Sequence, residues 1–238
     1  MSPLADLGLA LRLDWPFAAL AFLFGSIPWG LIVSRVFFKR DIRASGSGNI
    51  GAANALRTLG RTAGIAVLLL DALKGVAAVF VCGALLSGAV AGYASAQHVA
   101  VVDDSLRLAP VHALLAVLGH CYTPWLRFQG GKGVATYLGA IFSLAWPSGI
   151  AFALTWLAVV LPTRFASAGS MLATAVAGVV LVLVAQSVYG LSIWFFAIGS
   201  LLVIVWKHRE NIARLRAGTE SKLTSGRRSK DALTERSA

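Results

Sequence analysis

Two glycine-rich segments carry most of the polar side chains with which this chain could do chemistry. The first, residues 45–60, is SGSGNIGAANALRTLG and places serine and asparagine between glycines, with Arg57 near its end. The second, residues 127–136, is RFQGGKGVAT and places glycines on both sides of Lys132. Glycine lets successive backbone N–H groups turn into one concavity, while serine, asparagine and basic side chains add donors and charge. Both segments therefore predict the binding of an anion such as phosphate.

Neither segment is a nucleotide-binding loop. The glycines that begin at Gly46 match G-x-G-x-x-G, and Asp71 stands at the distance of a ribose-binding acid, but an apolar run precedes them where a dinucleotide fold needs a strand. In the second segment, Gly133 stands where a Walker A loop requires serine or threonine. Each segment taken alone is also compatible with a flexible loop that carries ordinary basic residues.

Two ionisable residues, Asp71 and Lys74, lie inside a long apolar run in the motif DALKG. Ionisable groups within a membrane span are costly and normally face the interior of the helix bundle. Their i, i+3 spacing lets the two side chains pair on one face of a helix. The pair has two interpretations, a structural ion pair that fixes helix packing and a part of a catalytic site.

A third polar segment, residues 207–220, follows the last apolar run directly and is KHRENIARLRAGTE. It either forms a basic helix at the membrane interface or closes a site through Asn211 and Glu220. His120 and His208 are the candidates for a general base. For both histidines we favour the alternative, a structural place at a helix end or at the interface.

A small-residue segment, TRFASAGS at residues 163–170, either lines a pocket with Ser167 and Ser170 or permits close helix packing. Both cysteines lie in or beside apolar runs and are expected to be small buried hydrophobes. The histidines have no metal-ligand spacing, and no Ser-His-Asp set or paired carboxylates occur. We therefore expect no metal and no cofactor.

The elements that must position these residues are membrane helices. The chain is 58% apolar and 13% charged, with a mean hydropathy of +0.77, whereas about a quarter of a soluble domain is charged. Apolar runs long enough to cross a bilayer recur along the sequence, which argues against a soluble protein. We predict an all-α membrane domain over residues 1–222 and a polar, disordered tail over residues 223–238. The seven predicted spans, some of them short, are 15–38, 63–91, 108–122, 134–146, 148–162, 170–186 and 191–206.

The basic residues predict the orientation of these spans. All lysines and arginines except Arg12, Lys74 and Arg107 fall on one side of the predicted topology. The positive-inside rule makes that side cytoplasmic, with the N-terminus outside and the C-terminus inside. The net charge of +11 thus reflects topology and contact with anionic lipid. We expect no nucleic-acid binding, because the chain has no soluble basic domain.

The combination of motifs resembles one bacterial family. SGSGNIGAANALRTLG, LDALKG, GHCYTPWLRFQGGKGVAT and HRENIARLRAGTE, in that order, are similar to the membrane glycerol-3-phosphate acyltransferases that use acyl-phosphate. The resemblance runs from the first span to Glu220. It implies a multi-pass protein of the inner membrane with seven spans, an external N-terminus and a cytoplasmic site formed by glycine-rich loops, which agrees with the orientation that the charges give independently.

The resemblance implies acyl transfer from acyl-phosphate to the 1-hydroxyl of glycerol 3-phosphate, giving lysophosphatidic acid and phosphate. Its partners are these substrates and membrane lipid, with no obligatory protein partner. The implied catalytic residues are Ser47, Arg57, Lys132, Asn211 and Glu220. The expected phosphate-binding positions are Ser45, Gly46, Gly48, Asn49, Gly51, Asn54, Gly131 and Gly133. The secondary candidates are Asp71, Lys74, His120, Ser167, Ser170 and His208.

Two other functions are compatible with the pattern. A transporter of a phosphorylated solute would also use basic, glycine-rich loops at helix ends. Against it, the sequence shows no internal repeat, and its polar motifs lie on one face rather than at the midplane of the membrane. A non-enzymatic scaffold that binds anionic lipid through its basic tail is the third possibility.

Overall fold

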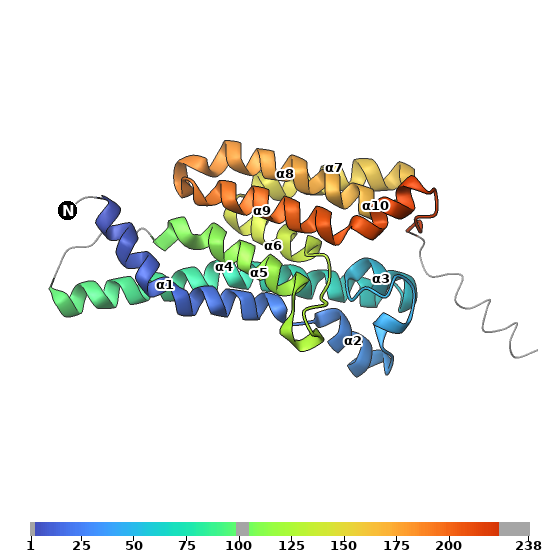
Figure 1. Ribbon diagram of the computed structural model, residues 1–238, viewed down its shortest axis with the longest axis horizontal. Helices are drawn as coiled ribbons and strands as arrows, with labels where there is room; N and C mark the ends of the chain where they lie inside the picture. Colours follow the sequence, from blue (N-terminus) through green and yellow to red (C-terminus); the bar gives the residue numbers. More distant parts are fainter. Residues whose placement is uncertain (1–2, 99–104, 224–238) are drawn as a thin grey trace, which may run out of the picture.

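The computed structural model, drawn in Figure 1, describes residues 3–98 and 105–223. Within these two stretches the chain forms helices and no strand, so the predicted all-α class is confirmed. The predicted tail, apart from its first residue, lies outside the described residues. The α-helices are α1 (Pro3–Ser26), α2 (Trp29–Phe38), α3 (Ala52–Thr58), α4 (Arg61–Gln97), α5 (Ala109–Cys121), α6 (Val134–Leu144), α7 (Trp146–Thr163), α8 (Ala166–Tyr189), α9 (Ser192–Lys207) and α10 (Arg209–Arg216).

The prediction of one span over residues 15–38 is wrong, because the chain breaks there into α1 and α2. The break falls at residues 27–28, where Pro28 has no N–H to donate and restricts the residue before it. The other predicted spans each coincide with one helix, and α4 extends beyond residues 63–91 at both ends. Residues Gly8–Ser26, α4, α7 and α8 are long and apolar enough to cross a membrane, while α2, α6 and α9 are shorter apolar helices. Seven crossings therefore remain a prediction.

The helices pack in three tiers (Figure 1). Helices α7 to α10 lie on one side, α1 and α4 lie on the other, and α5 and α6 lie between them. The largest apolar cluster fills the space among α5, α6, α8 and α9, where Tyr137 stacks on Phe196 with ring centroids 5.4 Å apart. This core joins the tiers. Cys121 in the core and Val134, which packs against it, lie before and after the glycines of the second glycine-rich segment.

Glycines let the central helices approach closely. A Cβ on Gly75 of α4 would stand 2.2 Å from the carbonyl oxygen of Thr136 in α6, and one on Gly139 would stand 2.0 Å from that of Ala72. Close backbone contact through small residues is the usual way that helices associate within a bilayer. The contact brings the start of α6, which follows Lys132, against the middle of α4.

The outer surface of the bundle is apolar. Leu69, Phe80, Leu154, Leu183 and Leu202 are each at least 60% exposed. Patches of this kind are rare on soluble proteins, but lipid covers them at no cost. With the long apolar helices, this surface is that of a multi-pass membrane protein.

The packing of α4 on α6 gives a prediction. Gly75→Ala should lower the thermal unfolding midpoint of the detergent-solubilised protein, since overpacking costs about 1–3 kcal/mol. Gly83 lies in the same helix and has no heavy atom within 4 Å of an added Cβ, so Gly83→Ala is the matched control and should leave the midpoint unchanged or raise it. Equal midpoints for the two variants would contradict the close approach of the helices.

Candidate active site

The three polar segments, far apart in sequence, line one cavity of about 570 Å³. Its wall comes from the loop before α3, from α3 to α8, from α10 and from the chain that follows α10. Of the predicted site residues, Ser45, Gly48, Lys74 and Gly131 are not in this wall. Those that are in it are Gly46, Ser47, Asn49, Gly51, Asn54, Arg57, Asp71, His120, Lys132, Gly133, Ser167, Ser170, His208, Asn211 and Glu220.

Asn54 of α3 holds the first glycine-rich loop in shape. Its side chain is buried, its Nδ2 donates to the carbonyl oxygens of Ile42, Ser45 and Asn49 at 2.8–3.1 Å, and its Oδ1 accepts from the amide of Ser47 at 2.9 Å. Every one of these contacts is to the chain that leads into α3. Asn54 therefore shapes the loop, and the neighbouring side chains are left to face the cavity.

The loop differs from the expected cradle of free backbone amides. The amide of Ser47 bonds Asn54, that of Gly48 bonds the Ser45 carbonyl at 3.2 Å, and that of Gly51 bonds the Asn49 side chain at 2.9 Å. Turn formation has used these donors. These three amides are therefore not free for an anion, and the residues with polar side chains in the wall on this side include Ser47, Asn49 and Arg57.

Arg57 offers an incompletely paired cation. Its Nε is buried and has no hydrogen-bond partner in the described part of the chain. Burial lowers the pKa of its guanidinium, an effect that Glu220 opposes, yet an arginine stays charged. An oxyanion with two acceptors would satisfy this group better than water does in a half-buried wall.

Glu220 connects the C-terminal segment to the wall. Its buried carboxylate accepts from Ser167 Oγ at 2.7 Å, from Asn211 Nδ2 at 2.6 Å and from Arg214 Nε at 2.8 Å. Burial raises the pKa of this carboxyl, but the three hydrogen bonds outweigh it and hold the pKa below its usual value. Glu220 is thus a fixed anion that ties α10 and the chain after it to α8.

Lys132 extends the same chain of contacts across the cavity. Its Nζ donates to Asn211 Oδ1, and Asn211 is itself held by Glu220. Burial lowers the pKa of Lys132 to about 8, with Glu220 opposing and Arg214 and Arg57 adding to the effect. Lys132 is therefore largely protonated at neutral pH and loses its charge under mildly alkaline conditions.

His208, between α9 and α10, is buried beside Lys132. Burial and the lysine charge lower the pKa of its imidazole to about 4, so it is neutral at pH 7. Its Nδ1 contacts the Ile204 carbonyl at 2.8 Å, and a carbonyl only accepts, so Nδ1 carries the proton. His208 consequently holds a lone pair on Nε2 and is a weak base.

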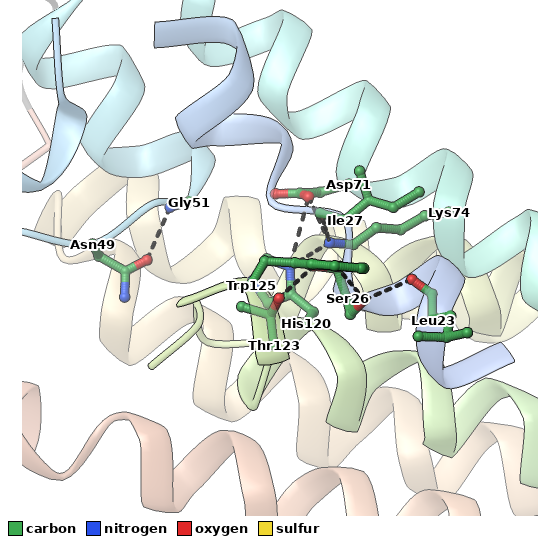
Figure 2. A network of polar contacts seen from close by, with 10 residues as sticks. All are labelled: Leu23, Ser26, Ile27, Asn49, Gly51, Asp71, Lys74, His120, Thr123 and Trp125. Carbon is green, nitrogen blue, oxygen red and sulfur yellow. Dashed lines mark hydrogen bonds and ion pairs between the residues drawn. The ribbon is translucent and has the colours of Figure 1, made fainter. Parts of the chain in front are cut away.

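Lys74, between Asp71 and His120, joins α4 to α5 beneath the cavity (Figure 2). Its Nζ lies 2.9 Å from Asp71 Oδ1, 2.8 Å from His120 Nδ1 and 2.9 Å from the Ile27 carbonyl at the α1–α2 break. Nearby, Thr123 Oγ1 donates to the Ser26 carbonyl at 2.7 Å. The proline break in the first predicted span thus supplies a ligand to a buried ammonium.

The far wall of the cavity is apolar, and its residues were not identified from the sequence. It includes Leu68, Leu138, Phe152, Trp156 and Leu157. Leu68 and Leu157 also reach the outer surface, where they are 39% and 43% exposed. The cavity therefore has a cationic side and an apolar side that extends to the lipid-facing surface.

Arg214 is the charged wall residue that sequence reasoning missed. It follows Asn211 by three residues on α10, so helical spacing placed both on one face and could have identified it. Within the described residues, the wall holds three cations, Arg57, Lys132 and Arg214, and two carboxylates, Asp71 and Glu220. Asp71 is paired with Lys74, which leaves Glu220 to the three cations. No group of three or more His, Cys, Asp or Glu side chains within residues 3–98 and 105–223 is arranged to hold a metal ion.

A membrane helical bundle whose interior cavity combines excess positive charge with an apolar wall is suited to an amphiphilic anionic substrate. The family model for glycerol-3-phosphate acyltransferase matches residues 15–218. Relatives of that name from Ruegeria sp. and Rhodopseudomonas palustris are 44% and 42% identical, covering 94% and 86% of this chain and 98% and 92% of theirs. The chain therefore belongs to the glycerol-3-phosphate acyltransferase family, a family of lipid-biosynthetic enzymes.

Solved structures agree with this assignment. The crystal structure of PlsY (YgiH), an integral membrane glycerol 3-phosphate acyltransferase, in its glycerol 3-phosphate form superposes with a TM-score of 0.72 at 33% identity, covering 90% of this chain and 96% of that one. The lysophosphatidic acid form of PlsY gives a TM-score of 0.69 at 32% identity, covering 91% and 96%.

The contacts of Glu220 give a prediction. Glu220→Ala should destabilise the protein by about 2–4 kcal/mol, because two buried donors and the partly exposed Arg214 lose their acceptor. Hydrogen exchange should rise over residues 209–223 before the rest of the bundle. Glu210→Ala is the matched control, since its side chain is 73% exposed and lies 4.0 Å from Arg214, and such pairs contribute about 0.5 kcal/mol. Equal exchange in both variants would refute the role of Glu220 as a fixed anchor.

Proposed function

We propose that this protein transfers a fatty acyl group from acyl-phosphate to the 1-hydroxyl of glycerol 3-phosphate. The products are lysophosphatidic acid and inorganic phosphate. The observation that carries the proposal is the pairing, in one cavity, of Arg57 and Lys132 with an apolar wall that reaches the outer surface. Both substrates carry phosphate and one carries a hydrocarbon tail, which is the combination that such a cavity accommodates.

Different residues of the cavity bind the two substrates in this proposal. Ser47, Asn49 and the loop that holds them bind the phosphoryl group of the acyl-phosphate. Arg57 and Lys132 hold glycerol 3-phosphate, with Asn211 orienting Lys132 and Glu220 orienting Asn211. Fixing the two reactants in attack geometry removes several kcal/mol from the barrier, and the cations stabilise charge that develops on the departing phosphate. The acyl tail lies along the apolar wall toward the bilayer.

The reaction needs no strong base from the protein. The 1-hydroxyl oxygen forms a bond to the acyl carbon, the bond from that carbon to the phosphate oxygen breaks, and the hydroxyl proton leaves. Imidazole with a pKa of about 4, as in His208, is a weaker base than a phosphate with a second pKa near 6. The proton therefore passes to the departing phosphate.

We also propose that the cavity faces the cytoplasm of the bacterial inner membrane. The segments that line its polar side belong to the basic side of the chain, and the positive-inside rule makes such segments cytoplasmic. Glycerol 3-phosphate carries two negative charges near neutral pH, so an enzyme that takes it from the cytoplasm avoids moving it across the bilayer.

Phosphate release tests the proposed function directly. Purified protein should release phosphate from palmitoyl-phosphate only when glycerol 3-phosphate is present, and palmitoyl-CoA should not replace the donor. Arg57→Ala should lower kcat/KM by about 10²–10³-fold, whereas Arg61→Ala, an exposed arginine outside the cavity, should change it little. Release that does not depend on the acceptor, or uptake of glycerol 3-phosphate into liposomes without turnover, would overturn the assignment.

The charge of Lys132 predicts a pH profile. A lysine whose pKa is about 8 is protonated below that pH and neutral above it, and kcat/KM reports groups of the free enzyme. We expect kcat/KM to fall roughly tenfold per pH unit above that pKa. Lys132→Arg keeps its charge throughout this range, so its lower activity should be flat up to about pH 10. A decline of the same shape in Lys132→Arg would assign the titration to another group.

A further inference from the structure

The ammonium of Lys74 is surrounded by three polar partners. An ammonium has three N–H donors and no acceptor, and three partners surround this one at hydrogen-bond distance, namely Asp71 Oδ1, His120 Nδ1 and the Ile27 carbonyl (Figure 2). Lys74 is only 4% exposed. Asp71 Oδ1 has no hydrogen-bond partner within the described residues, so its contact with Lys74 is an ion pair, while His120 Nδ1 and the Ile27 carbonyl are the hydrogen-bond partners. A buried amine beside a carboxylate and a carbonyl fits a protonated lysine that donates to His120 Nδ1.

The contact between Lys74 and His120 fixes the tautomer of the histidine. A ring nitrogen that faces an N–H donor must present its lone pair, so Nδ1 of His120 is unprotonated. A neutral imidazole then carries its proton on Nε2. His208 has the opposite arrangement, since its Nδ1 donates to a carbonyl. The two histidines in the wall therefore present different groups, a donor from His120 and a lone pair from His208.

The proton on Nε2 of His120 faces the second glycine-rich loop. The amide of Gly131 bonds the His120 carbonyl at 3.0 Å, and a Cβ on Gly131 would stand 2.0 Å from His120 Nε2. Any side chain at this position would collide with the Nε2 edge of the ring, so glycine is required there. His120 lines the cavity together with Lys132, the residue that follows Gly131.

We propose that His120 is a neutral hydrogen-bond donor to an anionic oxygen of a bound phosphoryl group, and that Lys74 and Asp71 are positioning residues that hold it in the Nε2–H tautomer. His120 is then a binding and catalytic donor and never a general base. The inference rests on the proposed function for the identity of the phosphoryl group, because either substrate supplies this chemistry. The tautomer itself rests on the contacts of Lys74 alone.

Two substitutions at His120 separate this role from a structural one. Glutamine places an amide N–H near the position of Nε2 but cannot reach Lys74 as the ring does. Asparagine places an oxygen near Nδ1, where it accepts from Lys74, but offers no donor to the cavity. We expect His120→Gln to retain at least tenfold more kcat than His120→Asn, with the latter reduced by about 10²-fold from wild type. Thermal midpoints of both variants identify any loss of fold.

A structural role predicts the reverse order, since only asparagine preserves the contact with Lys74. Equal or higher kcat in His120→Asn than in His120→Gln would therefore overturn the proposal. The substrate whose KM rises in the two variants identifies the phosphoryl group that His120 binds. If only the KM for glycerol 3-phosphate rises, His120 binds the phosphate of the acceptor. If only the KM for palmitoyl-phosphate rises, His120 binds the phosphoryl group of the donor.

The tautomer can be measured without turnover. In protein labelled with ¹⁵N-histidine, the signal that disappears in His120→Gln should show an unprotonated Nδ1 and a protonated Nε2 near neutral pH. A protonated Nδ1, or an imidazolium, would overturn the inference even if the enzyme is active. Conversely, this ¹⁵N pattern in a protein that fails to release phosphate would support the assigned tautomer and contradict the proposed function.

Discussion

The carboxylate of Glu220 is the interaction on which the cavity depends. It lies between α8 and α10, receives three hydrogen bonds, and through Asn211 holds the ammonium of Lys132. Without a buried anion here, the cations of the cavity would repel one another in a medium that screens charge poorly. One carboxylate allows the polar segments to converge but leaves the cavity with an excess of positive charge. That excess makes an anionic ligand favourable.

The membrane sets the second constraint, because backbone polar groups that are shielded from water must find their partners within the chain. Asn54 satisfies three loop carbonyls, and Lys74 satisfies the carbonyl that the proline break at Pro28 exposes. The hydrogen bonds of Asn54 and Lys74 therefore stabilise the local fold of the chain and are not available to a ligand. Ser47, Asn49 and Arg57 remain available to a ligand as a result, and the apolar wall on the opposite side is continuous with the lipid-facing surface. The cavity thus has a polar wall held by hydrogen bonds and an apolar wall open to lipid. This arrangement suits a reaction between a water-soluble reactant and a reactant from the membrane.

Much of the fold followed from local patterns. The apolar runs located most helices, and glycine beside serine, asparagine and lysine located the polar wall. The break at Pro28 was predictable, since a proline inside an apolar run ends a helix. The hydrogen bond from Lys74 to the Ile27 carbonyl at this break was not predictable, because the two residues are distant in sequence. The apolar wall and the tautomer of His120 arise from such long-range contacts. The occupied amides at Ser47, Gly48 and Gly51 arise from contacts at most seven residues apart, but they depend on the exact turn that the loop adopts. Composition and spacing do not encode them.

The central claim is that an excess of positive charge in one cavity selects a phosphorylated acceptor. Calorimetric titration of the purified protein with glycerol 3-phosphate, beside an identical titration with glycerol, tests it most directly. We expect saturable binding of glycerol 3-phosphate at one site per chain, weakened by added salt, and no detectable binding of glycerol. Binding of glycerol with comparable affinity, or no binding of glycerol 3-phosphate by folded protein, would contradict it.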